Sequence, residues 1–334
     1  MKAIVVRHAG PPEALLLEER PDPAPAAGQA RVRLRAAGLN HRDVWQRKSF
    51  PGPEPMILGS DGAGIVEAVG APADEAWVGR EVMINPGLYW GEREEAHGPA
   101  FQILGNPTPG TYAEAVAVPV ENLVPRPAHL DWVQAAALPL AGLTAWRALF
   151  TQGALRPGQT VLLPGIGSGV AGLALLFAKA AGARVLVTSS DDAKLAKARE
   201  QGADGAVNYG DAHWEDAVRD LAGPEGIDLV LDHSGEKTLP ADVRLVRAGG
   251  HVVFLGVTTG VELRLNIRDL FFHQVHLVGT YMGSPREFAA MARFVRHCRI
   301  SAEVQHVFPL AQAAQAHELM ESGRQYGKIV LTME

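Results

Sequence analysis

The segment TVLLPGIGSGVAGLALLFAKAAGARVLVTSS carries the residue pattern with the clearest chemistry in the chain. An apolar run of strand length enters a turn with glycines at positions 165, 167, 169 and 172, and an apolar stretch of helix length follows. Glycines let a backbone approach a pyrophosphate closely, and a helix N-terminus offers free N–H groups and a partial positive charge. Because the turn joins a strand to a helix and leads on to a second strand, we expect it to bind a dinucleotide.

Further cofactor contacts are expected where the later strands end. The carboxyl ends of the strands of an open α/β sheet border the ligand crevice. The cofactor-binding residues expected on these grounds are Gly167, Ser168, Gly169 and Val170 in the turn, His233 and Ser234 after LVLD, and Gly256 and Val257 after VVFL.

The end of the second strand indicates which dinucleotide is bound. NAD sites usually place an acidic residue there for the ribose 2′-hydroxyl, whereas NADP sites need small, polar or basic groups for the 2′-phosphate. Ser189, Ser190 and Lys194 could hold that phosphate, so NADP is favoured over NAD. Asp191 leaves an alternative open, because it could repel the phosphate, bind a hydroxyl or cap the next helix.

Two patterns of secondary structure surround these residues. Residues 1–124 form short β segments separated by Pro and Gly, as in a barrel-like all-β unit. From residue 125 strands alternate with helices, and these strands are continuous apolar runs. That alternation predicts a doubly wound parallel sheet that is covered on both faces. After residue 266 the pattern is mixed.

The composition excludes several classes of protein. A length of 334 residues favours two domains, and 47% hydrophobic with 20% charged residues is ordinary for a globular protein. The net charge of −6, without a Lys/Arg run, argues against a nucleic-acid partner. No signal-peptide pattern and no apolar run of about 18 residues is found, so we expect a cytoplasmic protein without membrane contact. The one cysteine, Cys298, allows no internal disulfide and no multi-cysteine zinc site.

Several motifs, in this order, resemble the medium-chain dehydrogenase/reductase superfamily over essentially the whole chain. They are GLNHRDVW (38–45), LGSDGAGIVEAVG (58–70), GTYAEAVAVP (110–119), AAALPLAGLTAW (135–146), the glycine turn and GKIVL (327–331). The resemblance implies an α/β fold with a GroES-like β-barrel domain at residues 1–124 and 267–334. A Rossmann domain, residues 125–266, is then inserted between them, with the cofactor cleft between the two domains. An edge strand near HVVFLGV, followed by VELRLNI, favours a homodimer.

The superfamily divides by its use of zinc, so the metal-ligand positions matter. By resemblance, the first cysteine ligand falls on Asn40, the histidine on Ser60, the following acidic residue on Asp61 and the second cysteine on Leu140. Catalytic zinc needs three protein ligands of N, S or O type, and leucine cannot be one. We therefore expect no catalytic zinc.

The structural-zinc lobe of some relatives gives the same expectation. Such relatives carry four cysteines after an Asn-Pro-Gly-Leu start, which the chain keeps at residues 85–88. Trp90, Arg93 and Ala96 stand where cysteines would be expected. The segment from residue 86 to 110 is therefore predicted to be a metal-free remnant, held down by Trp90 or Phe101.

Catalytic roles are carried over by resemblance to the zinc-independent quinone oxidoreductase-like branch, whose Asn-x-x-Asp pattern matches Asn40 and Asp43. Asn40 is expected to face the nicotinamide, and Thr144 to contact the nicotinamide ribose. Tyr209 resembles an adenine-side contact and Lys328 a basic residue near the cofactor. Each role has an alternative: an ion pair with Arg42 or Arg47 for Asp43, helix packing for Thr144, a strand-end aromatic for Tyr209 and surface solvation for Lys328.

Without zinc, hydride addition to a conjugated acceptor is easier than oxidation of a simple alcohol, because the π system spreads the developing negative charge. We therefore expect an NAD(P)H-dependent oxidoreductase that transfers a hydride to a quinone or an α,β-unsaturated carbonyl compound. One alternative is a metal-free NAD(P)-dependent alcohol or aldehyde dehydrogenase. The other is a non-enzymatic NADPH-binding structural or RNA-binding protein.

Overall fold

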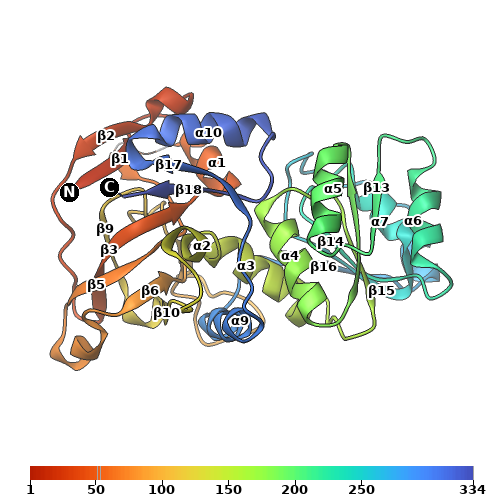
Figure 1. Cartoon of the computed structure of the whole chain (residues 1–334), viewed down its shortest axis with the longest axis horizontal. Helices are drawn as coiled ribbons and strands as arrows, with labels where there is room; N and C mark the ends of the chain where they lie inside the picture. The colour runs from red at the N-terminus through yellow and green to blue at the C-terminus, as the bar shows by residue number, and fades with distance from the viewer. Residues whose placement is uncertain (51, 53, 334) are drawn as a thin grey trace. The chain divides into compact units, whose positions relative to one another are not determined.

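The computed structural model of the chain describes residues 1–50, 52 and 54–333 (Figure 1). Its backbone contacts divide the chain into two compact units. Unit 1 comprises Met1–Leu143 and Gly283–Glu334, and unit 2 comprises Thr144–Met282. Both termini lie in unit 1, so one continuous segment is inserted between its two parts.

Unit 1 consists mainly of short paired strands. Its strands are β1 (Lys2–Val6), β2 (Leu16–Glu19), β3 (Gln29–Gly38), β4 (Met56–Ile57), β5 (Ala63–Val69), β6 (Glu81–Ile84), β7 (Gly87–Leu88), β8 (Gln102–Ile103), β9 (Ala115–Pro119), β10 (Leu123–Pro125), β17 (Val304–Pro309) and β18 (Lys328–Thr332). Its helices are α1 (His41–Ser49), α2 (Trp132–Ala136), α9 (Pro285–Cys298) and α10 (Ala313–Ser322), while α3 (Pro139–Trp146) runs on into unit 2.

The main sheet of unit 1 has the strand order β10-β6-β5-β3-β18-β17, and β9 also pairs with β3. The C-terminal strand β18 pairs antiparallel with β3, so the unit needs both ends of the chain. Figure 1 shows α10 running beside β17 and β18. A cluster of buried apolar residues there, including Leu39, Val44, Tyr112, Ala316 and Met320, fixes the loop and helix that carry Asn40 and Asp43.

Unit 2 has one parallel sheet. Its strands are β11 (Thr160–Leu163), β12 (Arg184–Ser189), β13 (Gly205–Asn208), β14 (Ile227–Asp232), β15 (Val246–Phe254) and β16 (His276–Gly279). Its helices are α4 (Gly169–Ala180), α5 (Asp192–Glu200), α6 (Trp214–Ala222), α7 (Leu239–Leu245) and α8 (Ile267–Phe272). The strand order β13-β12-β11-β14-β15-β16 is the 3-2-1-4-5-6 order of a doubly wound Rossmann fold, so the predicted fold class is confirmed.

The two units are divided later in the chain than the predicted boundaries after residues 124 and 266. The short helix α2 packs against β3 and β5 of unit 1, although its apolar sequence resembles that of the following domain. At the other end, β16 pairs with β15 and extends the sheet of unit 2 beyond residue 266.

The expected edge strand of unit 2 was placed wrongly. β15, which contains HVVF, lies between β14 and β16, and β16 is the edge strand. Residues 261–266 of the VELRLNI segment form no strand, and Ile267 begins α8. Alternation and apolar character could not separate these segments, because pairing partners are not visible in a sequence. In the described part of the chain, no helix is both long and apolar enough to cross a bilayer.

Candidate functional site

The glycine turn of unit 2 has the geometry of a phosphate cradle. Gly165 and Gly167 adopt positive φ angles of 68° and 124°, which side chains disfavour. The φ of 124° requires a glycine at position 167, and a Cβ atom there would also lie 2.8 Å from Cδ of Lys194. Ser168 caps α4 by accepting a hydrogen bond from the Ala171 N–H at 3.2 Å. The N–H groups at the start of α4 precede the first intrahelical bond, as in an anion-binding helix terminus.

The predicted 2′-phosphate residues lie at the end of β12 and in the segment that follows it. The Tyr209 hydroxyl is 3.2 Å from Oγ of Ser190, and both side chains are exposed. The Lys194 side chain lies close to Gly167, since a Cβ at that glycine would be 2.8 Å from Cδ of Lys194. Ser189 is buried, and its hydroxyl accepts a hydrogen bond from the Asp191 N–H. Ser189 therefore stabilises the turn between β12 and α5 from the buried side.

Asp191 is a helix cap, which was one of the alternatives in the sequence. Its carboxylate accepts hydrogen bonds from the Ala193 N–H at 2.9 Å and the Lys194 N–H at 3.3 Å. Capping uses one oxygen, Oδ1, and holds the side chain at the N-terminus of α5, where negative charge is favourable.

The ends of β14 and β15 meet the glycine turn, as expected for strand ends at one edge of the sheet. A Cβ at Gly165 would lie 3.2 Å from Cε1 of His233, and one at Gly256 would lie 1.9 Å from the His233 carbonyl oxygen. Burial lowers the pKa of His233, and the charge of Asp232 partly offsets this lowering. Ser234 contacts the His233 ring at 3.2 Å. The fold thus gathers His233, Ser234 and Gly256 beside the turn, while Val257 next to them is exposed.

A buried pair of carboxyl groups supports this corner. Oδ1 of Asp232 accepts hydrogen bonds from the N–H groups of Ser234 and Gly235, both at 2.7 Å. Burial and the neighbouring Asp232 raise the pKa of Asp242 well above its ordinary value of 3.8. The raised pKa favours the protonated form of Asp242, whose O–H can donate a hydrogen bond to the Asp232 carboxylate. Sequence reasoning missed both residues, because their contact joins α7 to β14.

In unit 1, the zinc-ligand positions of the superfamily form one polar cluster. Lys328 is 3% exposed, and its ammonium donates hydrogen bonds to the Leu39 carbonyl at 2.6 Å, Oδ1 of Asn40 at 2.6 Å and Oδ2 of Asp61 at 2.9 Å. Asn40 Nδ2 donates to Oγ of Ser60 at 3.1 Å. Surface solvation of Lys328, the alternative left by the sequence, is excluded by this burial.

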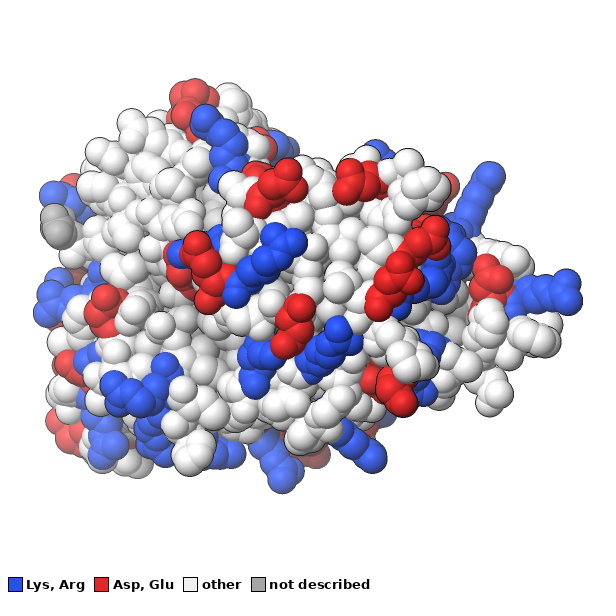
Figure 2. All heavy atoms as spheres, turned by 45° about the vertical axis from the view of Figure 1, so that its right-hand side comes forward, with Lys and Arg blue, Asp and Glu red and all other residues white. Residues whose placement is uncertain are grey.

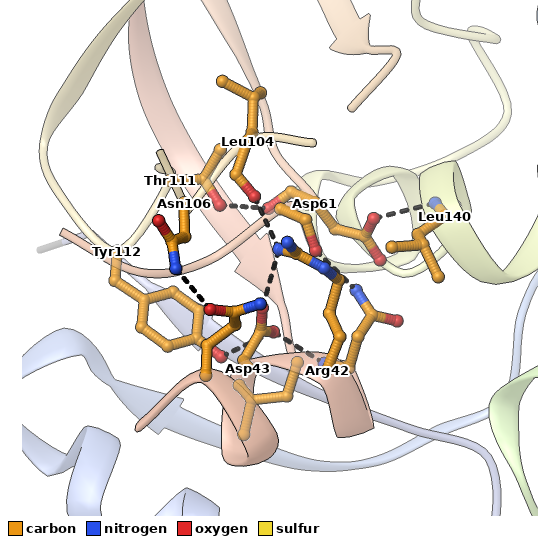
Figure 3. Close-up of polar contacts among 12 residues, drawn as sticks. Arg42, Asp43, Asp61, Leu104, Asn106, Thr111, Tyr112 and Leu140 are labelled. Carbon is orange, nitrogen blue, oxygen red and sulfur yellow. Dashed lines mark hydrogen bonds and ion pairs between the residues drawn. The ribbon is translucent and has the colours of Figure 1, made fainter. Parts of the chain in front are cut away.

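Asp61 joins this cluster to the start of α3. Its Oδ1 accepts a hydrogen bond from the Leu140 N–H at 2.7 Å, a contact drawn in Figure 3. The carbonyl oxygen of Asp61 accepts another from the Thr111 hydroxyl at 2.7 Å. Asp61 is fully buried, so its charge is compensated from within the cluster.

The donor set does not fit a catalytic zinc ion. The Asn40 and Asp61 oxygens that a metal would need are bound by an ammonium, and the leucine side chain offers no ligand atom. A divalent cation would also be repelled by the Lys328 charge within the same cluster. Among the described residues, no group of three or more His, Cys, Asp or Glu side chains is arranged to hold a metal.

Asp43 fixes the backbone of Asn40. Oδ2 of Asp43 accepts hydrogen bonds from the Asn40 N–H at 2.9 Å and from the Tyr112 hydroxyl at 3.1 Å (Figure 3). Burial raises the pKa of Asp43 to about 6, while the nearby Arg42 acts in the opposite direction. Of the two ion-pair partners considered for Asp43, Arg42 is 3.9 Å from Oδ1, whereas Arg47 pairs with Glu321.

A chain of hydrogen bonds continues from Tyr112 into α10. Nε2 of His317 is 3.3 Å from the Tyr112 hydroxyl, and Nη1 of Arg47 is 3.3 Å from Nδ1 of His317. Burial and the Arg47 charge lower the pKa of His317 to about 3, so the ring is neutral. Because a guanidinium can only donate, Nδ1 accepts, and Nε2 donates toward Tyr112. The chain passes through the Arg47 guanidinium, which donates onward to Glu321 and does not give up a proton, so the chain orients Asp43 and does not carry protons to solvent.

Tyr112 and His317 were not predicted as members of the site. Tyr112 lies in the motif GTYAEAVAVP, which was a signal for it, whereas nothing local marks His317. Thr144, predicted near the nicotinamide ribose, is buried on α3 in unit 2. Its predicted role stays a prediction.

The remnant lobe is held as expected by its aromatic residues. Trp90 is 3% exposed, donates a hydrogen bond from Nε1 to the Arg93 carbonyl at 2.8 Å, and meets Phe101 edge to face at 5.4 Å between ring centroids. β7 and β8 form its only strands among the described residues.

A doubly wound sheet with a glycine turn, together with a barrel-like unit, defines the class of dinucleotide-dependent dehydrogenases and reductases. The alcohol dehydrogenase GroES-like domain family matches residues 26–128, and the zinc-binding dehydrogenase family matches residues 169–297. The chain belongs to the medium-chain dehydrogenase/reductase superfamily, and it is an NAD(P)H-dependent oxidoreductase.

Individual relatives differ in the activity that their names state. The chain is 34% identical to the zinc-type alcohol dehydrogenase-like protein YogA of Leptosphaeria maculans, covering 92% of each chain. It is 31% identical to a quinone oxidoreductase of Pseudomonas aeruginosa, covering 99% of each. A crystal structure described as an NAD-dependent alcohol dehydrogenase is 40% identical, with a TM-score of 0.93 and complete coverage of both chains.

Proposed function

We propose that the chain is a zinc-independent reductase that transfers a hydride from NAD(P)H to a quinone or an α,β-unsaturated carbonyl compound. The observation that carries this proposal is the Lys328–Asn40–Ser60 cluster at the former metal-ligand positions. An amide N–H can bind a carbonyl oxygen, but it cannot acidify an alcohol as zinc does. The 31% identical quinone oxidoreductase supports the same chemistry.

Within this proposal, the bound dinucleotide supplies the hydride. Asn40 donates an amide hydrogen to the acceptor oxygen, where negative charge collects as the hydride adds to carbon. Asp43 keeps the Asn40 backbone in place through the bond from its N–H. Thr144 contacts the nicotinamide ribose, and the N–H groups of Gly169 and Val170 bind the pyrophosphate.

We further propose that NADPH is preferred over NADH. Lys194 and Ser190 provide a cation and a hydroxyl beyond β12, and the Asp191 carboxylate is engaged in capping α5. Tyr209, bonded to Ser190, stacks near the adenine in this arrangement. The related structure described as NAD-dependent makes this a direct question for experiment. Binding should be measured by fluorescence quenching for both nucleotides, and tighter binding of NADH would refute the preference.

The alternative function is a metal-free alcohol or aldehyde dehydrogenase, which is favoured by the 40% identical relative of known structure. An acceptor panel decides between the two. The purified protein is assayed with NADPH and a quinone or an enone, and with NADP and a primary alcohol, alongside metal analysis. Faster turnover of the alcohol, or stoichiometric zinc required for activity, would overturn the proposed function.

We also propose a homodimer formed through the edge of unit 2. β16 is an edge strand, and the neighbouring α8 exposes Ile267, Phe271 and Phe272 by 72%, 66% and 68%. Apolar side chains of this size beside an unpaired edge are usual at subunit interfaces. Light scattering should give twice the chain mass, and Phe271→Asp should shift it toward the monomer. A monomeric wild type would refute the proposal.

Figure 2 bears on the expected absence of a nucleic-acid partner. Over the face that it displays, acidic and basic side chains are interspersed and do not gather into an area of one sign. Nucleic-acid binding relies on clustered cations that displace counterions. The expectation of a small-molecule substrate is consistent with this surface.

A further inference from the structure

The Lys328 ammonium is fixed inside unit 1. An ammonium has three hydrogens, and the Leu39 carbonyl, Oδ1 of Asn40 and Oδ2 of Asp61 accept them. The backbone is fixed as well, because the Leu39 N–H donates to the carbonyl of the next residue, Ile329, at 2.9 Å. Lys328 therefore acts on the loop before α1, and its own hydrogens are occupied there.

This contact determines which end of the Asn40 amide faces outward from the ammonium. The two ends of an amide have the same shape but opposite hydrogen-bonding character. Because Oδ1 accepts from Lys328, Nδ2 must lie on the other side, where it donates to Ser60. An amide nitrogen carries two hydrogens, and the hydrogen bond to Ser60 uses one of them.

Other contacts prevent the side chain from leaving this position. Asn40 has an extended backbone conformation, with φ −132° and ψ 151°, and it caps α1 while its N–H is held by Asp43. The side chain is 7% exposed, so neighbouring groups restrict its rotation. Rotation of the amide about its terminal bond is then the main freedom left, and the ammonium opposes it.

We propose that Lys328 is a positioning residue that presents the second Nδ2 hydrogen of Asn40 to the acceptor oxygen. This inference rests on the proposed function. In it, the positive charge of Lys328 helps to stabilise the developing negative charge on the acceptor oxygen, which zinc does in metal-dependent relatives. As the hydride adds to carbon, a C–H bond forms, the π electrons move to oxygen, and water later supplies the proton. The charge of Lys328, acting through the amide, strengthens the hydrogen bond to that oxygen.

A flipped amide would have the opposite effect. With Lys328 removed, Oδ1 of Asn40 loses its strongest partner, and the amide can turn Oδ1 toward the acceptor. Two oxygens bearing partial negative charge would then face one another, and the transition state would lose its donor. The expected loss falls on kcat, because the interaction strengthens only as charge develops.

The principal test is chemical rescue of Lys328→Ala, in the full-length protein. This substitution removes the atoms from Cγ to Nζ, and n-propylammonium restores that set of atoms. We expect kcat with the accepted quinone or enone to fall about 10- to 100-fold, while the NADPH dissociation constant stays within about threefold. Added n-propylammonium should restore kcat in a saturable manner, and n-propanol, which lacks the charge, should not.

Two results would overturn the inference. One is a folded Lys328→Ala variant with unchanged kcat. The other is a rise in melting temperature with n-propylammonium that is not accompanied by recovery of kcat, which would show a purely structural ion pair with Asp61. If Lys328→Ala does not fold, the charge-balanced pair Lys328→Met with Asp61→Asn replaces it, and the same loss of kcat is expected.

Asn40→Asp is the matched variant for the amide itself. It keeps a partner for Lys328 and has no N–H, so kcat should fall at least as far and n-propylammonium should not restore it. Failure of the proposed function is a separate result. If the wild type turns over only alcohols, that function is wrong, and the Lys328 comparison made with the alcohol still decides the inference.

Discussion

Asp43→Asn offers a quantitative test of the electrostatics behind Asn40. The pKa of Asp43 is about 6 in the folded protein and 3.8 for the free side chain. Each pH unit of such a difference corresponds to about 1.4 kcal/mol, so ionisation of Asp43 lowers the free energy of unfolding by about 3 kcal/mol. Because the folded pKa is raised, the stability is fully present below the unfolded pKa and is lost as the pH rises to about 6.

The asparagine of the Asp43→Asn variant cannot ionise, so the difference between variant and wild type isolates this effect. The other groups around Asp43, which include Arg42, Tyr112, Asp61 and Lys328, are the same in both proteins. Between about pH 4.5 and about pH 8 the free energy of unfolding of the variant should gain about 2 kcal/mol relative to wild type. Urea unfolding of both proteins, followed by tryptophan fluorescence across this range, measures the difference.

A difference that does not change with pH would refute the reasoning, whatever its absolute size. A constant offset in the free energy of unfolding is expected in addition. Oδ1 of Asp43 is buried without a hydrogen-bond partner, so an amide nitrogen that replaces it in the variant would also be buried. A change of the opposite sign would mean that Arg42 outweighs burial and lowers the pKa of Asp43. Dependence on pH, and not the stability at one pH, is therefore the decisive result.

Three further perturbations test other parts of the structure. Gly167→Ala should weaken NADPH binding at least about tenfold, because an alanine at φ 124° strains the turn and its Cβ displaces the Lys194 side chain. Gly172→Ala, where nothing lies within 4 Å, should bind normally, and equal binding by both variants would contradict the cradle. Trp90→Ala should expose residues 86–110 to limited proteolysis, since removing a buried tryptophan side chain costs about 3–5 kcal/mol. Unchanged cleavage would show another anchor. Asp242→Asn should leave the melting temperature nearly unchanged, because the pKa of Asp242 is raised and a neutral donor is retained, while Asp242→Leu should cost about 1–3 kcal/mol; equal losses would contradict a neutral Asp242.

Local patterns in the sequence were sufficient for the glycine turn and the elements around it. A strand, a glycine turn and a helix are adjacent in the chain, and positive φ angles at Gly165 and Gly167 follow from the residue type. The resemblance to the superfamily extended this to both domains and to the altered zinc-ligand positions. The fold class and the superfamily were predictable because neighbouring residues, or motifs in a fixed order, contain the needed information.

The remaining features depended on contacts between distant parts of the chain. Lys328 looked equally suited to solvent or to a cofactor until β18 paired with β3 and placed its ammonium against Asn40 and Asp61. Likewise, His317 is 205 residues from Tyr112 in sequence, yet it helps to orient Asp43. Burial and pairing of this kind are set by how strands and helices pack, so only the tertiary structure could show that a lysine ammonium contacts the loop that leads into α1.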